Sequence, residues 1–228
     1  TVYDIPEAEL AMKLAAFEDT LEEGLGLAYL PSAGLIRLRL TARGKAVDRL
    51  DGFFNRLLKA LDGLSFETNC ADTAEEEIGR RLAAGGVTVA CAESCTGGNI
   101  AHLITARPGA SAYFLGGVVA YANEVKKNVL GVRAEDLEKY GAVSEPVALQ
   151  MAEGARRVTG ADFAAATTGV AGPDGGTPEK PVGTVWIAVA GPKGAHARKF
   201  VFSHTRERNI GRASVKALRM LLEEIEKA

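Results

Sequence analysis

From residue 87 to its end, the chain alternates short apolar runs with segments that have the spacing of amphipathic helices. Several runs are apolar throughout, as expected for strands that are covered on both faces of a sheet. Strands alternating with helices predict an α/β fold, here a three-layer α/β/α domain with a mixed, mostly parallel sheet. The last two runs, joined by "PKG", predict an antiparallel pair at one edge. The predicted strands are residues 87–94, 116–121, 162–170, 184–191 and 195–202, and the predicted helices are residues 97–107, 123–131, 144–160 and 206–227.

The first 70 residues have a different pattern, which predicts a small α+β domain in the order helix, strand, strand, helix. The polar stretch "SFETNCADT" separates this domain from the alternating part, and Thr73 and Glu76 have the spacing of a helix capping box. We therefore predict two domains, residues 1–71 and residues 72–228. The predicted elements of the first are helices at 6–23 and 45–63 and strands at 26–32 and 35–44.

The composition of the chain excludes several functional classes. The net charge of −2, from 27 basic and 29 acidic residues, argues against nucleic-acid binding through phosphate contacts. The apolar runs are far shorter than the roughly 20 residues that a membrane-spanning helix needs, so we expect no membrane association. Three unevenly spaced cysteines are too few for a disulfide framework, which favours a reduced, cytoplasmic protein. Because the sequence starts with Thr1, we expect it to be part of a longer chain.

The segment "AESCTGG" joins the first strand of the alternating part to the following helix. Ligands of open α/β sheets collect at the carboxyl ends of the strands, which is where Ser94 is predicted to lie. The helix start exposes backbone N–H groups, and Gly97 and Gly98 would let a ligand approach them closely. Two interpretations are open: Ser94 is a nucleophile on an anion-binding turn, or Ser94 or Thr96 merely caps the helix. Cys95 is a second candidate nucleophile, because a helix N-terminus lowers the pKa of a thiol.

A serine nucleophile needs a base, and none of the three histidines lies at the end of a predicted strand. A lysine can take this role if burial lowers its pKa enough to leave the amine neutral. Tyr121 ends the second strand of this part, and Lys126 follows in a short helix that could face the serine turn. The neighbouring Val125 and Val129 favour Lys126 over Lys127 as the inward-facing residue. The alternative is that both lysines lie on a solvated helix face.

Two further segments could bind a substrate. Thr168 and Gly169 end the third strand and lead to the loop "AGPDGGTPEKPVG", which is longer than most connections. This loop could line a phosphate or amide pocket, or it could be a mobile surface loop. Arg206 begins the last helix, where its charge opposes the helix dipole, so it either recognises an anion or pairs with its neighbours. No histidine lies at metal-ligand spacing beside the cysteines, and we expect neither a metal nor a cofactor.

Five segments, running in order from about residue 74 to the end, resemble the C-terminal domain of the CinA family, the nicotinamide mononucleotide (NMN) deamidases. They are "AESCTGG", "GGVVAYANEVKKNVLGV", "YGAVSEPVA", "TGVAGPDGGTPEKPVGTVWIA" and "TRER". The segment with "AYLPSAGLIRLRLTARG" resembles the KH-like domain that precedes this unit in full-length CinA proteins. We find no GXXG loop in it, and residues 1–70 carry 8 basic and 11 acidic residues, so we do not expect it to bind RNA. Full-length members begin with a molybdopterin-binding-like domain, which we expect to precede this sequence.

The resemblance implies an amidohydrolase that converts NMN to nicotinic acid mononucleotide and ammonia through a serine–lysine pair. It implies that Ser94 is the nucleophile, that Lys126 is the base and that Tyr121 orients or polarises groups in the same pocket. The implied substrate-binding residues are Thr96, Gly97, Gly98, Thr168, Gly169 and Arg206, the last as the partner of the phosphate.

The chain departs from the family pattern at one place. Where the family commonly has Gly-Asp-Arg, this chain has His204-Thr205-Arg206, so the carboxylate beside the arginine is missing. The family also implies a homodimer. The alternative function is a catalytically silent nucleotide-binding or assembly module of a competence/damage-inducible CinA protein.

Overall fold

The computed structural model describes residues 1–3, 5–32, 35–66, 68 and 74–228, and of residues 74–78 it describes the backbone alone. The chain divides into two compact units, Thr1–Ala71 (unit 1) and Asp72–Ala228 (unit 2). The predicted capping box lies outside the described residues, because Thr73 and the side chain of Glu76 are not among them. Among the described residues, no helix is long and apolar enough to cross a membrane.

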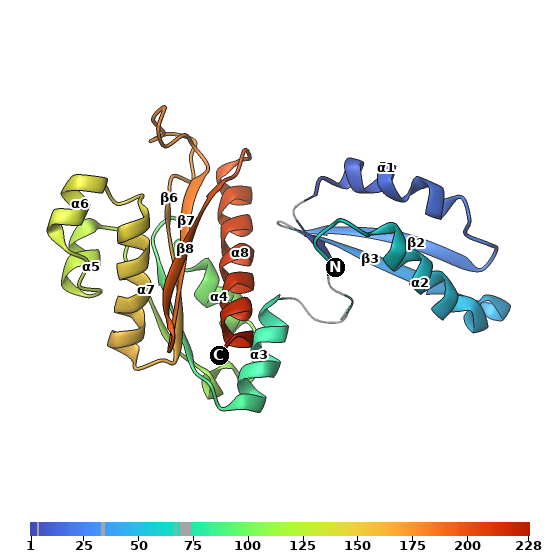
Figure 1. The fold of residues 1–228 in the computed structure, drawn as a ribbon, viewed down its shortest axis with the longest axis horizontal. Helices are drawn as coiled ribbons and strands as arrows, with labels where there is room; N and C mark the ends of the chain where they lie inside the picture. The colour runs from blue at the N-terminus through green and yellow to red at the C-terminus, as the bar shows by residue number, and fades with distance from the viewer. Residues whose placement is uncertain (4, 33–34, 67, 69–73) are drawn as a thin grey trace. The chain divides into compact units, whose positions relative to one another are not determined.

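Unit 1 is an antiparallel three-stranded sheet with two α-helices packed on it (Figure 1). Both predicted strands are present, and a two-residue strand too short to show any periodicity is added beside them. The predicted helix at 6–23 ends early, because the N–H and the hydroxyl of Thr20 both bond to the carbonyl oxygen of Phe17, at 3.0 and 2.6 Å. The predicted helix at 45–63 begins as a separate 3₁₀ helix, Gly44–Arg49. The elements are β1 (Val2–Tyr3), α1 (Glu7–Glu18), β2 (Leu25–Ser32), β3 (Leu35–Ala42) and α2 (Leu50–Ala60), and the sheet order is β1-β3-β2.

Unit 2 is a three-layer α/β/α sandwich, which confirms the predicted fold class. Its five-stranded sheet has the order β5-β4-β6-β7-β8; β5, β4 and β6 are parallel, whereas β7 is antiparallel to β6 and to β8. Helices α5, α6 and α7 lie on one side of this sheet, and α3, α4 and α8 lie on the other (Figure 1). The elements are α3 (Ala74–Gly85), β4 (Val89–Glu93), α4 (Asn99–Thr105), β5 (Phe114–Val119), α5 (Asn123–Asn128), α6 (Ala134–Tyr140), α7 (Glu145–Thr159), β6 (Phe163–Gly169), β7 (Thr184–Gly191), β8 (Gly194–Val201) and α8 (Arg206–Glu226).

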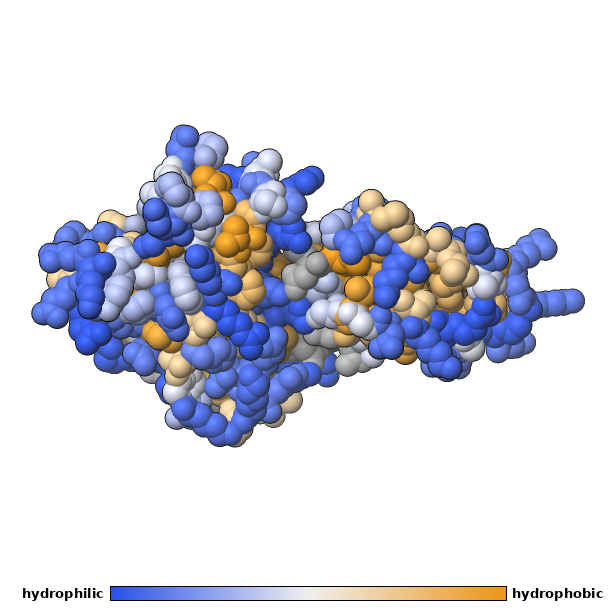
Figure 2. All heavy atoms as spheres, turned by 45° about the horizontal axis from the view of Figure 1, so that its top comes forward, coloured by the Kyte–Doolittle hydropathy of each residue, from blue (hydrophilic) through white to orange (hydrophobic). Residues whose placement is uncertain are grey.

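Two apolar layers, one on each face of the sheet, form the core of unit 2. Larger side chains such as Ile187 and Leu218 fill the layer beneath α8, whereas alanines dominate the layer beneath α7. The small alanine side chains of the sheet let α7 approach it closely. The buried face of α7 also consists largely of alanine and glycine, so the two surfaces pack closely against each other. The outer surface of unit 2 is mainly hydrophilic on the face drawn in Figure 2, because most of its apolar side chains lie in these layers.

The parallel strands bring three chain segments together at their carboxyl ends. Glu93, the last residue of β4, lies opposite Val119 of β5 and Thr167 of β6. Beyond the strands, the N–H of Ala120 donates to the carbonyl oxygen of Glu93 at 2.8 Å, and the N–H of Ser94 donates to that of Thr167 at 2.9 Å. The residues that follow β4, β5 and β6 are therefore neighbours in space, and they include most of the predicted site residues.

Candidate active site

Ser94 is the first residue after β4, in the turn that leads to α4. It is partly exposed, whereas Glu93 before it and Cys95 after it are buried. Its N–H is held by β6, and the carbonyl oxygen of the preceding residue is held by the segment after β5. The backbone thus fixes Ser94 at the carboxyl edge of the sheet, which is the position that the sequence predicted.

The carboxylate of Glu93 is the centre of this turn, and the sequence reasoning missed it. The residue is only 1% exposed. Its Oε2 accepts hydrogen bonds from the hydroxyl of Thr96 at 2.7 Å and from the N–H groups of Gly98 and Ile100 at 3.0 Å each, and its Oε1 accepts from the N–H of Ala101 at 2.9 Å. These are the donors that a helix start leaves unpaired. The available signal was a carboxylate at the end of an apolar strand, because such a group must find donors when it is buried.

This arrangement gives the two glycines a structural role within the turn. Both have positive φ angles, 63° at Gly97 and 100° at Gly98, so glycine is favoured at each position. However, the N–H of Gly97 donates to the carbonyl oxygen of Ser94 at 3.2 Å, and that of Gly98 donates to Glu93. Both N–H groups thus have acceptors within the turn and hold it together, and their role as donors to a substrate stays a prediction.

Two predicted hydroxyl donors are also engaged within the protein. Thr96, 3% exposed, donates to Glu93, and its oxygen lies 2.6 Å from Oγ1 of Thr167. Because a carboxylate only accepts, Thr167 is the donor in this second bond. The hydroxyl of Thr168 donates to the carbonyl oxygen of Ala142 at 2.8 Å. Both hydroxyls therefore donate to protein acceptors in this structure, and their role as donors to a substrate stays a prediction.

The backbone of Gly169 lies too close to β7 to accommodate a side chain. A Cβ at this position would lie 2.6 Å from the carbonyl oxygen of Thr184. This contact explains the glycine by packing, and a role for Gly169 in substrate binding stays a prediction.

Lys126 is almost completely buried, at 1% exposure, although it lies on the short helix α5. Its Nζ donates to the carbonyl oxygens of Ala120 and Tyr121, at 2.8 and 3.1 Å, in the segment that follows β5. Burial lowers the pKa of Lys126, because the charged ammonium loses its hydration. Lys127 instead pairs with Glu124 at 2.7 Å and is partly exposed. The prediction that Lys126 is the inward-facing residue is confirmed.

Cys95 follows Ser94 in the same turn, but it is a poor nucleophile. Burial raises the pKa of its thiol to about 12, while a smaller electrostatic effect of Lys126 lowers it. A protonated thiol at 6% exposure neither attacks a substrate nor meets a reagent readily. The carbonyl oxygen of Ala120 accepts from Nζ of Lys126, and the N–H of Ala120 donates to the carbonyl oxygen of Glu93, so the lysine amine lies near the end of β4 where the serine turn begins.

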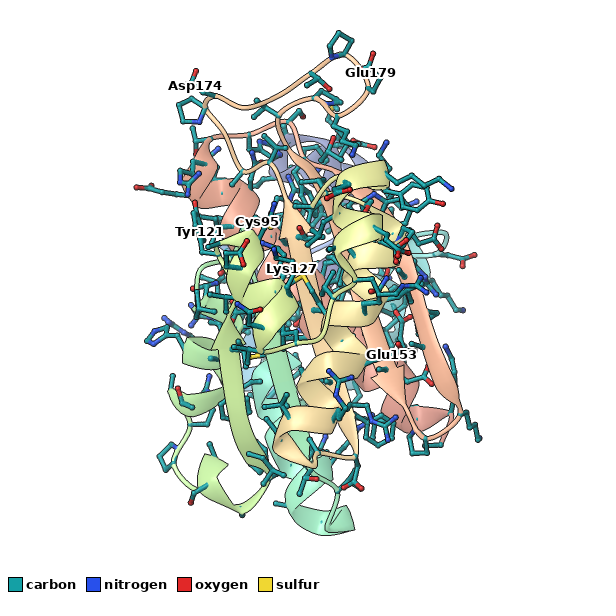
Figure 3. All side chains as sticks on the ribbon, turned by 90° about the vertical axis from the view of Figure 1, so that its left-hand side faces the viewer. Cys95, Tyr121, Lys127, Glu153, Asp174 and Glu179 are labelled. Carbon is teal, nitrogen blue, oxygen red and sulfur yellow. The ribbon has the colours of Figure 1, made fainter. Side chains whose placement is uncertain are left out.

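Tyr121 and Arg206 connect this turn to the loop at residues 170–183. One guanidinium nitrogen of Arg206 donates to the carbonyl oxygen of Gly172 at 2.8 Å, and the other donates to the hydroxyl of Tyr121 at 3.1 Å. Tyr121 is 61% exposed, so its ring is accessible to a ligand. Figure 3 shows Cys95 and Tyr121 towards the end of the sheet that carries the loop with Asp174 and Glu179, while Glu153 lies farther down α7.

A buried asparagine, Asn209, holds the entry to α8. Asn209, 1% exposed, accepts from the N–H of His204 at 3.2 Å and donates to the carbonyl oxygens of His204 and Ala171, at 3.0 Å each. The entry to α8 and the base of the long loop are therefore joined. Arg206 takes its orientation from Gly172 and Tyr121 rather than from an adjacent aspartate.

Two of the histidines have side-chain partners of their own. His204 contacts Arg212, and His196 faces Glu224 at 3.5 Å, so both have partners away from Ser94. Within the described residues, no group of three or more His, Cys, Asp or Glu side chains is placed to hold a metal ion.

Comparison with known sequences relates the chain to one family. Residues 71–225 match the model of the CinA C-terminal domain. A CinA-like protein of Cytophaga hutchinsonii is 43% identical over 221 residues, covering 95% of this chain and 53% of that protein. One of Anaeromyxobacter sp. is 56% identical over 150 residues, covering 66% of this chain and 37% of that protein. The chain thus spans about half, or less, of the length of these curated relatives.

Solved structures agree with this relationship. The competence/damage inducible protein CihA of Agrobacterium tumefaciens has a TM-score of 0.63 and 40% identity, over 67% of this chain and 96% of its own. The competence damage-inducible protein A of Klebsiella pneumoniae has a TM-score of 0.65 and 38% identity, over 68% of this chain and 98% of its own.

Proposed function

The chain belongs to the CinA family, and on that premise we propose that unit 2 is an amidohydrolase which converts NMN to nicotinic acid mononucleotide and ammonia. The observation that carries this proposal is the buried Lys126, whose pKa is lowered beside a turn that presents a serine. A lysine held in this way supplies a neutral amine, which is what a serine nucleophile needs when no histidine accompanies it.

The reaction uses the same two residues twice. Lys126 takes the proton of the Ser94 hydroxyl as the oxygen attacks the carboxamide carbon, and a tetrahedral intermediate forms. The intermediate collapses when Lys126 returns this proton to the leaving nitrogen, which departs as ammonia and leaves an ester on Ser94. Lys126 then takes a proton from water, the hydroxide attacks the ester, and Ser94 regains its proton as the nicotinic acid mononucleotide leaves. Atoms balance with water as the only co-reactant.

The phosphate of NMN is assigned to Arg206. A guanidinium has five N–H donors in a planar arrangement that suits phosphate. The bonds to Gly172 and Tyr121 use two of them and leave the others for a ligand. Arg206 donates to the hydroxyl of Tyr121, and the carbonyl oxygen of Tyr121 accepts from Lys126. Tyr121 therefore links the residue proposed for the phosphate to the residue proposed for the carboxamide of one small substrate.

The test is ammonia release from NMN by the chain and by three variants. We expect Ser94→Ala and Lys126→Ala to lower kcat on the order of 1,000-fold or more, because each removes one member of a unit that acts together. The matched control is Cys95→Ala, the adjacent residue in the same turn, which should keep kcat within about threefold because its thiol is protonated and buried.

Other results would contradict the proposal. Equal activity of the parent and the Ser94→Ala and Lys126→Ala variants would exclude the serine–lysine mechanism. Loss of activity in Cys95→Ala alone would reassign the nucleophile to the thiol. If the parent releases no ammonia but binds NMN, unit 2 is a nucleotide-binding module, which is the alternative function.

A further inference from the structure

We propose that Glu93 is a positioning residue, whose buried carboxylate holds Ser94 in the geometry that makes it reactive. The inference rests on the proposed function, because it takes Ser94 as the nucleophile. It concerns a group that the reaction itself does not use. Glu93 gives no proton to the substrate and touches no reacting atom; it acts through the turn that follows it.

The first observation is that the carboxylate is buried among donors of its own turn and helix start. In the part of the chain that the structure describes, no lysine or arginine forms an ion pair with Glu93. Burying a carboxylate without a cation is costly unless hydrogen bonds replace the lost water. Here one hydroxyl and three N–H groups replace it, together with the thiol of Cys91, whose Sγ lies 3.5 Å from Oε1. The carboxylate keeps its main donors only while Thr96, Gly98, Ile100 and Ala101 keep their positions.

The second observation is that Ser94 lies between two fixed points, both of which involve Glu93: one through its main chain and one through its side chain. On one side, the main chain at Glu93 and Ser94 is bonded to the segments after β5 and in β6. On the other side, the Glu93 side chain reaches over the turn and holds Gly98. Residues 94–98 thus form a short loop that is closed by the side chain of the residue before it. Ser94 cannot shift along the turn without breaking one of these bonds.

The third observation is that the α4 start has no donors left for an external anion at these positions. A helix start with free N–H groups attracts anions such as phosphate. Glu93 takes that place in this structure, so the N–H groups of Gly98, Ile100 and Ala101 are occupied by the protein's own carboxylate. Reaction rates depend on sub-ångström placement of the attacking atom, so a fixed turn accelerates the attack by Ser94.

A purely structural role makes a different prediction from a positioning role. If Glu93 only stabilises the fold, its replacement lowers the fraction of folded protein and leaves each folded molecule as reactive as before. If Glu93 positions Ser94, the folded molecules themselves react more slowly. The rate per folded molecule therefore separates the two roles.

The experiment measures how fast a fluorophosphonate probe labels Ser94 in the folded protein, located by mass spectrometry, together with kcat and KM for NMN. The main variant is Glu93→Gln, which keeps the size of the side chain. Its single oxygen can accept from Thr96, Gly98 and Ile100, but its amide then directs a donor at the N–H of Ala101. Glu93→Asp keeps the charge on a shorter side chain and tests for partial rescue.

The matched control is Asp136→Asn. Asp136 is also a carboxylate with little exposure, at 9%, in the first turn of a short helix, where it accepts from Gln150 at 2.7 Å and from Arg133. Each amide variant replaces a carboxylate of little exposure near a helix start by an amide of the same size; Asp136 differs from Glu93 in that it also pairs with Arg133 at 2.7 Å. We expect the probe to label Ser94 at the native rate in the folded fraction of Asp136→Asn. In folded Glu93→Gln we expect the probe to label Ser94 about 10- to 100-fold more slowly. Glu93→Asp should lie between these values.

For NMN we expect kcat of Glu93→Gln to fall by the same factor while KM stays within about twofold, because the substrate contacts are elsewhere. Native labelling by folded Glu93→Gln would overturn the proposal, and so would a parent chain in which the probe does not label Ser94. If labelling slows as expected but the parent does not hydrolyse NMN, the positioning role stands and the proposed substrate fails.

Discussion

At the scale of single residues, Lys126 gives the proposed reaction a defined pH dependence. A lysine accepts a proton only as the neutral amine, and burial lowers the pKa of Lys126 from its ordinary value of 10.5. We therefore expect kcat/KM for NMN to rise about tenfold per pH unit below this lowered pKa and to level off above it. The measurement is a pH profile of ammonia release, with the inflection expected clearly below pH 10.5.

Thermal unfolding of Lys126→Met provides an independent check on the same pKa. Between the lowered pKa of the folded state and the ordinary pKa of the unfolded state, the unfolded chain binds more protons, so the stability of the parent rises with pH. Below the folded-state pKa, the charging cost of the buried amine is fully present. The difference in melting temperature, parent minus Lys126→Met, should therefore increase as pH rises from neutral towards 10. A difference that does not change with pH would show that Lys126 has an ordinary pKa.

At the scale of secondary-structure elements, the close approach of α7 to the segment after α5 supports the position of Lys126. A Cβ at Gly154 in α7 would lie 2.2 Å from the carbonyl oxygen of Leu130, which is backbone and cannot rotate away. In an unhindered helix, replacing glycine with alanine stabilises by about 0.5–1 kcal/mol. At Gly154 we expect the opposite sign, a loss of about 1–3 kcal/mol in the free energy of unfolding from overpacking, measured by urea denaturation.

Gly52→Ala is the control for this prediction, because a Cβ at this position in α2 has no neighbour within 4 Å. It should leave unit 1 equally stable or slightly more stable. Gly154→Ala should also lower kcat, since Leu130 is close in sequence to Lys126 and the N–H of Val132 is bonded to the carbonyl oxygen of Lys126. A stabilised Gly154→Ala variant would show that helix propensity outweighs this contact.

The elements also show which parts of the structure the sequence could predict. Apolar runs located the strands of unit 2, because strands covered on both faces leave a continuous apolar signal. Helix α6 was missed, because its only buried residue is Asp136 and it therefore has no apolar stripe. In the site, Ser94, Tyr121 and Lys126 follow from their places after strands. Glu93 was missed: its only signal was a carboxylate at the end of an apolar strand, and three of its donors are backbone N–H groups, which leave no trace in the sequence.

The hydroxyls and glycines of the site show a related limit of sequence-based prediction. Thr96, Gly97, Gly98 and Thr168 are residue types that bind ligands, and their neighbourhood was predicted correctly. Whether such a donor is free depends on acceptors from segments distant in sequence, such as Ala142 for Thr168. Composition and spacing carry no information about that competition, so the sequence could locate the turn but not assign its hydrogen bonds.

At the scale of the whole molecule, the region that matches the family model begins at the boundary between the two structural units. Solved relatives match 67–68% of this chain and 96–98% of their own chains, and the model of the CinA C-terminal domain matches residues 71–225, which lie almost entirely in unit 2. The longer Cytophaga relative matches 95% of this chain, so its similarity extends into unit 1. Unit 2 also has its own two-layer core and holds every residue of the proposed site.

These facts predict that residues 72–228 alone fold and keep the activity of the 228-residue chain. We expect kcat and KM for NMN to stay within about twofold of the full chain, because no proposed step uses a residue of unit 1. The measurement compares ammonia release by both proteins, normalised to the amount of Ser94 that the fluorophosphonate probe can label. A folded unit 2 that labels normally but loses more than about tenfold in kcat/KM would show that unit 1 contributes to substrate binding, and would move part of the binding site outside the residues assigned to it.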